Sequence, residues 1–371
     1  MQQRNYAIQY IRGLAMLGVI GIHVGAYSLD SPSANIHLFA ILDIFTRFSV
    51  PIFFFLSAFG LFLNHDLYSG FSYITFIKRR FHAVAIPYFV WSFLYLVRYY
   101  SSVNWSPSAL LETFIFGLAC YHLYFLVILL WFYLLMPVWR WLLRHIVATP
   151  LPALFILLIF QIFFNYYSSY MLHYQPQNHI VALLLQYRLN YVVLHYIFIF
   201  LFGAICALRF SDFTAFIKKY RSQINIFFFA SLAALLANYY WLLYIRGLTP
   251  VDASGIVHQL NPLGVIYTLA ACLFFYAQFE TISSKIIASL LNTLGHYSYT
   301  VYLLHPFVLA FLTGLVLKMH LSPTPPIIVA VFFGVSLLSL LLAILMEKLS
   351  QQFYMIGVLL TGSKQRPSMK A

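Results

Sequence analysis

Charged side chains are scarce in this sequence. Only 8% of its 371 residues are Asp, Glu, Lys or Arg, whereas water-soluble domains average about 25%. So few charges cannot solvate the surface of a soluble 43.0 kDa particle, but a surface that faces lipid needs none. The composition therefore excludes a soluble globular protein and indicates a membrane protein.

Cysteines and common catalytic motifs are also few. Cys120, Cys206 and Cys272 are widely spaced and form no CxxC or Cys/His pattern, so we expect small packing residues rather than a metal or redox site. There is no GxxxxGK[ST] phosphate loop, GxSxG elbow or HExxH, and no His is followed four residues later by Asp. These absences disfavour a nucleotide-driven transporter and a serine hydrolase. The net charge of +13 sits in short clusters, which disfavours a nucleic-acid partner.

Long hydrophobic runs dominate what is present, since 63% of the residues are hydrophobic and 20% aromatic. A helix of roughly 20 apolar residues crosses the hydrocarbon core. The sequence predicts an all-α membrane protein in which about ten transmembrane helices form one bundle. The predicted spans are 8–28, 39–63, 82–100, 122–140, 151–171, 191–208, 224–245, 261–279, 289–317 and 326–347.

The basic residues predict the orientation of the bundle. With the N-terminus inside, the outer connections hold four of the 21 basic residues, and Arg47 lies within a span; the four are Arg98, Arg188, Arg246 and Lys318. The positive-inside rule then places both termini in the cytoplasm. We expect residues 1–362 to form one multi-spanning membrane domain and 363–371 a short cytoplasmic tail. No A-x-A cleavage site follows the first span, so we expect that span to be retained.

Ionisable residues inside a span are costly and mark candidate sites. Arg12 and His23 lie eleven positions apart in the first span, which places them on the same helix face and roughly 16 Å apart along its axis. Arg12 is interpreted either as a topological anchor that snorkels to the interface or as part of a site. His23 is either a buried histidine bonded to a neighbouring helix or a catalytic base.

The second span carries Asp43 and Arg47 at positions i and i+4, where a carboxylate and a guanidinium can pair. The pair either neutralises itself or faces a polar cavity that it shares with His23. Pro51 removes one helix hydrogen bond and predicts a kink in this span.

Two further groups of polar residues are also candidate site residues. His122 and Tyr124 stand at the start of the fourth span. Ser298, Tyr302 and His305 lie at spacings of four and three, and therefore on one helix face. Such aromatic residues are typical of an interfacial belt, which is the alternative to a substrate site. His305 precedes Pro306, so its alternative role is to end regular helix geometry.

Four motifs in order give the sequence a specific resemblance to the acyltransferase 3 family of bacterial integral-membrane acyltransferases. The family's opening, an R-G-hydrophobic-A run with a histidine eleven positions after the arginine, is matched from Arg12 to His23. Its V-P-x-F-F phrase followed by S-G is matched by 50–54 and Ser57, with Ala58 in place of glycine. The resemblance covers nearly the whole chain.

The other two motifs lie further along. The family's H-L-W-F-L is similar to 122–126, with Tyr124 in place of Trp, and its S-Y-x-x-Y-L-x-H-P is similar to 298–306. The family often shows two arginines, separated by two residues, in the loop before the third span. Here Arg80 matches the first of these arginines, but Ala83 stands where the second would be.

The resemblance implies that the protein transfers an acyl group, commonly acetyl, from cytoplasmic acyl-CoA to a hydroxyl of a cell-envelope glycan or lipid-linked sugar. It implies a multi-pass protein of a bacterial plasma membrane that needs no metal. A neutral histidine suits the removal of the hydroxyl proton, and arginine suits phosphate binding. The catalytic candidates are His23, Arg12, Asp43 and Arg47. The donor-binding candidates are Arg12, Lys78, Arg79 and Arg80. The substrate candidates are His122, Tyr124, Ser298, Tyr302 and His305.

Two other functions remain open at this point. An exporter or flippase of a polysaccharide or lipid-linked intermediate is compatible with ten spans and a buried ion pair, although no internal repeat is detectable. A structural subunit of an envelope-synthesis complex is compatible with the fold, but the presence of both Arg12 and His23 disfavours it.

Overall fold

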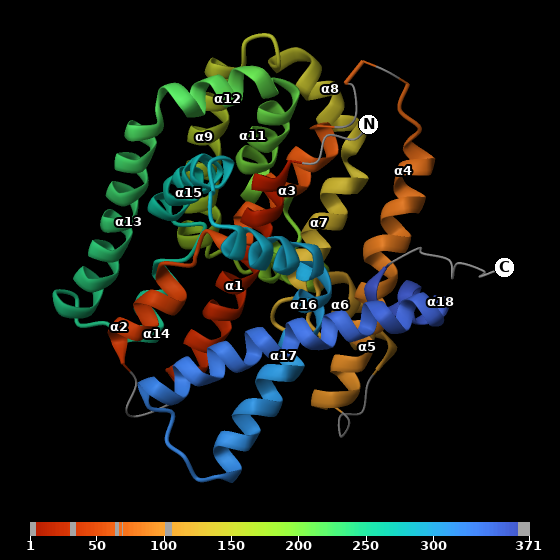
Figure 1. Ribbon diagram of the computed structural model, residues 1–371, viewed down its shortest axis with the longest axis vertical. Coiled ribbons are helices and arrows are strands. Elements are labelled where there is room, and N and C mark those ends of the chain that lie inside the picture. Colours follow the sequence, from red (N-terminus) through yellow and green to blue (C-terminus); the bar gives the residue numbers. More distant parts are fainter. Residues whose placement is uncertain (1–4, 30–34, 64–66, 69, 101–105, 363–371) are drawn as a thin grey trace.

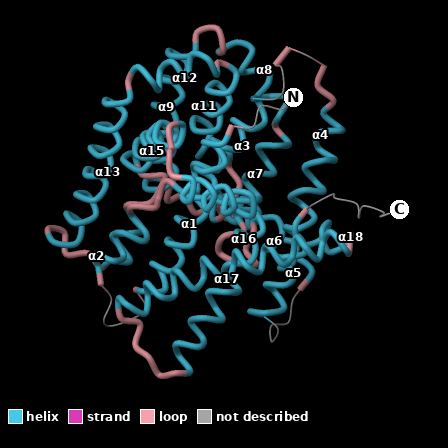
Figure 2. The backbone as a smooth tube through the Cα atoms, in the orientation of Figure 1, coloured by secondary structure: helices cyan, strands magenta, loops and turns pink. Residues whose placement is uncertain are grey.

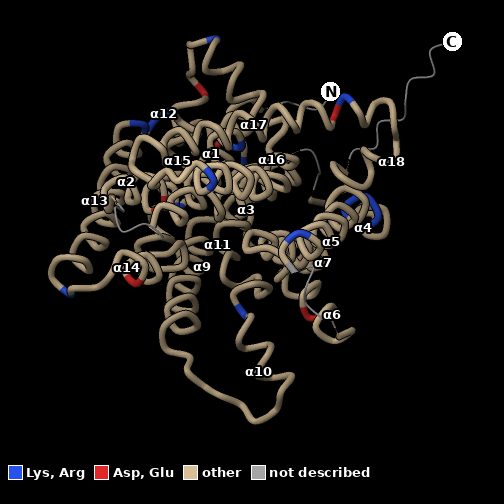
Figure 3. The backbone as a smooth tube through the Cα atoms, turned by 90° about the horizontal axis from the view of Figure 1, so that it is seen from below, with Lys and Arg blue, Asp and Glu red and all other residues tan. Residues whose placement is uncertain are grey.

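The computed structural model describes residues 5–29, 35–63, 67–68, 70–100 and 106–362. All regular secondary structure in these ranges is helical, as predicted, and short loops join the helices (Figures 1 and 2). The predicted tail, 363–371, lies outside the described residues. Figure 3 marks the basic and acidic positions, which are few and scattered along the tube.

Eight continuous helical stretches of the described chain are long and apolar enough to cross a bilayer. They are α1 (Tyr6–Ser28), α2–η1–α3 (Ile36–Phe39, Ala40–Ile44, Ser49–Leu63), α4–η2–α5 (Tyr73–Arg80, Phe81–Ala85, Ile86–Tyr100), α9–η3 (Pro150–Tyr166, Tyr167–Met171), α13 (Arg221–Tyr244), α15 (Pro262–Glu280), α16 (Lys285–Lys318) and α17 (Pro325–Gln352).

Two bent pairs bring the number of spans to ten if each pair is counted as one. They are α7 (Tyr124–Leu134) with α8 (Met136–Ile146), bent by 65°, and η5–α11 (Val193–Tyr196, Ile197–Leu208) with α12 (Phe210–Lys219), bent by 100°. Pro137 explains the first bend, because proline lacks the N–H that would continue α7. The shorter elements are α6 (Pro107–Phe116), α10 (His179–Gln186), η4 (Arg188–Asn190), α14 (Pro250–Ile256), α18 (Tyr354–Ile356) and η6 (Gly357–Thr361).

The third span differs from its prediction at the N-terminal end. It begins at Tyr73 rather than at residue 82, so Lys78, Arg79 and Arg80 form the last turn of α4 and not a loop. A membrane helix can extend beyond the hydrocarbon where its side chains are charged. Helical geometry then directs the three basic side chains to different sides of α4.

Helix α1 packs most closely against α16. Gly13 lies against the backbone of Leu291, and Gly295 lies against the backbone of Gln9, so a Cβ on either glycine would overlap a carbonyl oxygen. This close approach fixes the height of Arg12, the neighbour of Gly13, relative to α16. Helices α9 and α13 are mostly exposed on the periphery, as lipid-facing helices are, whereas α1, α3 and α15 are mostly buried.

The second span is irregular before Pro51. Residues 40–44 form the π-helical turn η1, which carries Asp43, and a tighter turn at 45–48 leads into α3. A proline ring displaces the carbonyl four residues earlier, here that of Arg47, so the kink predicted for this span lies one turn before Pro51. Tyr267 donates a hydrogen bond to the Phe45 carbonyl at 2.7 Å, which satisfies one polar group that the irregular turn frees.

Candidate functional site: an arginine-lined cavity beside a histidine cluster

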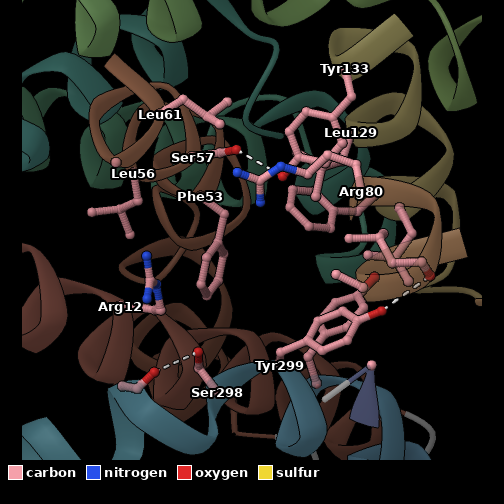
Figure 4. Close-up of a pocket in the computed structure, with 18 of the residues that line it drawn as sticks. Arg12, Phe53, Leu56, Ser57, Leu61, Arg80, Leu129, Tyr133, Ser298 and Tyr299 are labelled. Carbon is pink, nitrogen blue, oxygen red and sulfur yellow. Dashed lines mark hydrogen bonds between the residues drawn. The ribbon is translucent and has the colours of Figure 1, made fainter. Parts of the chain in front are cut away.

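A cavity of about 480 Å³ opens between α1, α3, α4, α7 and α16. Its apolar wall comes mainly from α3 and α7, and its polar wall comes from side chains on several helices. The apolar residues include Phe53, Leu56, Leu61, Phe125, Leu126 and Leu129, and the polar ones include Arg12, Ser57, Arg80, Tyr133, Ser298, Tyr299 and Tyr302. Figure 4 shows Arg12 and Arg80 extending towards the same space from different helices.

Neither guanidinium in this cavity is neutralised. Among the described residues, the ion pairs involve other basic groups, and no carboxylate lies within 4.0 Å of Arg12 or Arg80. Arg12 donates a hydrogen bond to the Gln9 side chain at 3.1 Å. The Arg80 guanidinium lies 5.4 and 5.1 Å from the ring centroids of Phe76 and Tyr133, at cation–π distance. Two positive groups facing one apolar-walled space make an anion site.

A cluster of histidines lies further along α1, at His23. The His23 ring stacks on His305 of α16 with centroids 5.3 Å apart, and it contacts the Tyr121 ring at 4.4 Å. His122 meets His305 edge-on at 5.3 Å. His23 is half-buried, whereas His122 and His305 are 3% and 0% exposed. His23 is therefore the histidine of this cluster that a bound molecule can reach.

Pro306 determines which nitrogen of His305 carries the proton. Helix α16 continues through Pro306, so the predicted end of regular geometry at this position is wrong. Proline has no N–H for the Tyr302 carbonyl, and the His305 Nδ1 lies 2.8 Å from that carbonyl and 3.2 Å from the Val301 carbonyl. A carbonyl only accepts hydrogen bonds, so Nδ1 is the protonated nitrogen and Nε2 carries the lone pair.

Polar atoms of the cluster lack partners. The Nε2 of His305 and both ring nitrogens of His122 are buried without a hydrogen-bond partner among the described residues. Buried polar groups are nearly always paired, so each exception needs a physical explanation. The cluster is thus suited to take up a proton or a polar substrate group.

Tyr302 joins the two parts of the site. Its ring lines the cavity and packs against His122 with centroids 4.9 Å apart, and its hydroxyl donates to the His122 carbonyl. His23 does not line the cavity; the Tyr302 ring lies 6.1 Å from the His305 ring, centroid to centroid, and His305 stacks on His23. Within the described residues, no group of three or more potential ligands is placed to hold a metal ion.

The predicted Asp43–Arg47 ion pair is present, with 2.5 Å between Arg47 Nη2 and Asp43 Oδ2. The same Nη2 lies 3.1 Å from the Ser254 hydroxyl. Close to this pair, the ring of His258 lies 3.2 Å from the Tyr170 hydroxyl. Burial, together with the positive charge of Arg47, lowers the pKa of His258 to about 4, so this histidine is neutral near pH 7. A polar region thus continues from Asp43 and Arg47 towards the loop that precedes α15.

We expect Asp43→Ala to destabilise the protein by about 3–5 kcal/mol, because it leaves the largely buried Arg47 without its counter-charge. The double variant Asp43→Ala/Arg47→Ala should lose much less, since it removes both charges. Thermal unfolding in detergent measures both values. Asp212→Ala is a control, because the Arg209–Asp212 pair is exposed and such pairs contribute about 0–1 kcal/mol. Additive losses in the double variant would show that the two residues do not stabilise each other.

The structure separates the predicted site residues into those it brings together and those it does not. Arg12, Arg80, Ser298 and Tyr302 line the cavity. Lys78 and Arg79 are exposed on other sides of α4. Tyr124 lies near Tyr196 and Gln259 instead of in the cavity or in ring contact with the histidines. Ala83 lines the cavity but adds no charge.

Two residues of this region, Ser57 and Tyr121, were not predicted as site residues. Ser57, which the sequence indicated only as part of a family motif, lines the cavity with its hydroxyl 3.1 Å from the Tyr133 hydroxyl. Tyr121 packs on His23. The sequence did offer a signal for both: Ser57 belongs to one family motif, and Tyr121 directly precedes another, which begins at His122. Cys120, Cys206 and Cys272 are buried, which confirms them as packing residues.

Comparison with known proteins identifies the family. No curated protein and no solved structure matches the chain. The model of the acyltransferase 3 family, described as an acyltransferase domain, matches residues 5–345. The match includes Arg12, His23, Arg80, His122 and His305. Since it covers most of the 371 residues, the chain belongs to the acyltransferase 3 family.

Proposed function

We propose that this membrane acyltransferase moves an acetyl group from cytoplasmic acetyl-CoA to a hydroxyl of a cell-envelope glycan or lipid-linked sugar. The observation that carries the proposal is the cavity in which Arg12 and Arg80 meet without a neutralising carboxylate. Coenzyme A carries several phosphate charges, and guanidinium groups bind phosphate through charge-assisted hydrogen bonds. The apolar wall of the cavity suits the less polar arm that leads to the thioester.

The proposed orientation follows from the charges of the chain. Both termini are cytoplasmic, the protein lies in a bacterial plasma membrane, and residues 1–362 act as one membrane domain. Arg12 then lies near the inner end of α1 and His23 in its outer half. At about 1.5 Å per residue the two lie roughly 16 Å apart along α1, a distance that the pantetheine arm is able to span.

His23 is the proposed base. As the acceptor hydroxyl attacks the thioester carbonyl, its oxygen forms a bond to the acyl carbon and its proton passes to His23. The carbon–sulfur bond then breaks, and the proton is delivered to the departing thiolate of coenzyme A. The half-buried position of His23 in a cluster of partnerless nitrogens supports this role. The Asp43–Arg47 pair holds a polar region beside it for the acceptor.

His305 is the proposed positioning residue. Its Nε2 lone pair lies in the cluster beside the His23 ring, so it can stabilise the imidazolium that His23 becomes. Tyr302 lines the cavity and contacts His305, so it links the proposed donor site to the histidine cluster.

We expect His305→Gln to lower kcat about 10- to 100-fold with little change in the KM for acyl-CoA, because the Arg12 and Arg80 cavity stays intact. It should also shift the acidic limb of the kcat–pH profile, since the neighbouring base loses the lone pair proposed to stabilise its imidazolium. Steady-state kinetics between pH 5 and 9 measure both effects. A lower kcat with an unchanged pH profile would show that His305 only supports packing.

The function is tested by incubating the purified protein with radiolabelled acetyl-CoA and membrane glycan fractions. Label in a glycan or lipid-linked sugar, removable by mild alkali as an ester is, supports the proposal. The exporter or flippase instead predicts movement of an unlabelled glycan across reconstituted vesicles. A structural subunit predicts neither a labelled acceptor nor glycan movement. Glycan movement without label, or neither result, contradicts the proposal.

A further inference from the structure

The chain that follows the last long helix returns to the cavity. Helix α17 ends at Gln352, and α18 and η6 lead on to Gly362. Figures 1 and 3 both place α18 beside α4 and α5, away from the start of α17. Thr361 and Gly362 line the same cavity as Arg12 and Arg80. The last two residues of the C-terminal segment, defined as 353–362, thus form part of the wall of that cavity.

Specific contacts hold the C-terminal segment in this place. The indole N–H of Trp91, a residue of α5 that is 4% exposed, donates to the Leu360 carbonyl at 3.0 Å. The Thr361 hydroxyl donates to the Gly357 carbonyl at 2.9 Å and closes the last turn of η6. A buried indole that donates to one backbone carbonyl fixes the height of the segment on α5.

Gly362 makes the closest approach. Its φ is +67°, in the left-handed region that favours glycine. A Cβ at this position would overlap the carbonyl oxygen of Ala83, which itself lines the cavity. Backbone conformation and backbone contact therefore both require glycine at 362.

The family match ends at residue 345, before the C-terminal segment begins. We propose that the C-terminal segment is a binding element of the acyl-donor site and sets the affinity for acyl-CoA. This inference rests on the proposed function. Thr361 and Gly362 carry no charge, so they contact the uncharged arm of the donor while Arg12 and Arg80 hold its phosphates.

Two variants loosen the wall in different ways. Gly362→Ala forces the segment away from Ala83, and Trp91→Phe removes the indole N–H together with part of the ring volume but keeps an aromatic ring on α5. We expect each to raise the Kd for acetyl-CoA about tenfold or more, which corresponds to about 1.4 kcal/mol. The kcat at saturating donor should change much less, because the His23 cluster is untouched.

The matched controls are Gly314→Ala, which meets open space on α16, and Trp241→Phe, whose ring is exposed on α13. Donor binding is measured by isothermal titration of the purified full-length proteins, after their thermal unfolding has been compared. Tenfold weaker binding in both variants but in neither control supports the inference. Wild-type affinity in Trp91→Phe overturns it, even if Gly362→Ala does not fold. Absence of acyl-CoA binding by the wild-type protein overturns the proposed function as well.

Discussion

Replacing His23 with Ala is expected to abolish measurable acyl transfer, a loss on the order of 10²- to 10⁴-fold, because the acceptor hydroxyl loses its base. The variant should still insert and purify as a monodisperse species. His23 is half-buried and packs through its ring on Tyr121 and His305, so its loss removes ring contacts and breaks no ion pair. Initial rates with labelled acetyl-CoA measure the effect.

His145→Ala is the matched control for this variant. His145 lies on α8 with its Nδ1 2.8 Å from the Trp141 carbonyl, and it does not line the cavity. We expect the control to keep wild-type turnover and His23→Ala to bind acyl-CoA with nearly wild-type affinity. Wild-type turnover in His23→Ala would remove His23 from the mechanism.

Arg12→Lys is expected to weaken binding of the acyl donor about 10- to 100-fold. Lysine keeps the positive charge but loses the planar fork that binds phosphate through two hydrogen bonds. Arg12→Ala should bind the donor still more weakly, because it removes the charge as well and leaves Arg80 as the remaining guanidinium in the cavity. The KM and Kd for acetyl-CoA measure this effect separately from kcat.

Arg79→Lys controls for a general change from arginine to lysine, since Arg79 is exposed one position before Arg80 and does not line the cavity. A topological anchor needs only charge. If Arg12 were merely such an anchor, Arg12→Lys would bind the donor as tightly as the wild-type protein does, and that result would exclude Arg12 from the donor site.

The sequence predicted the helical bundle well because membrane spans are a local property. Any stretch of about 20 apolar residues must satisfy its own backbone hydrogen bonds within the bilayer, which favours a helix wherever such a run occurs. The Asp43–Arg47 pair was predictable for the same reason, since partners at i and i+4 lie on one turn. The predicted start of the third span was wrong because the segment Tyr73–Arg80, although helical, is too polar to be recognised by hydropathy.

The candidate site was predictable only in part, because it depends on contacts between distant helices. The sequence grouped Lys78, Arg79 and Arg80 as equivalent cations, but the helical phase of α4 directs only Arg80 into the cavity. The position of the proton on His305 depends on a carbonyl that Pro306 frees within the same helix. The sequence alone could not show whether Pro306 ends this helix or is tolerated inside it. The wall at Gly362 depends on a contact with Ala83, which is distant in the sequence, and no local pattern encodes such a contact.

The central claim is that the donor enters at Arg12 and Arg80 from one side of the membrane and the acceptor reaches His23 from the other. Proteoliposomes with oriented protein test it, with labelled acetyl-CoA supplied on the cytoplasmic side only and a membrane-impermeant acceptor glycan on the opposite side only. The account predicts labelled acceptor in this arrangement and none when the two substrates are exchanged. Efficient transfer only when donor and acceptor are both on the cytoplasmic side would contradict it.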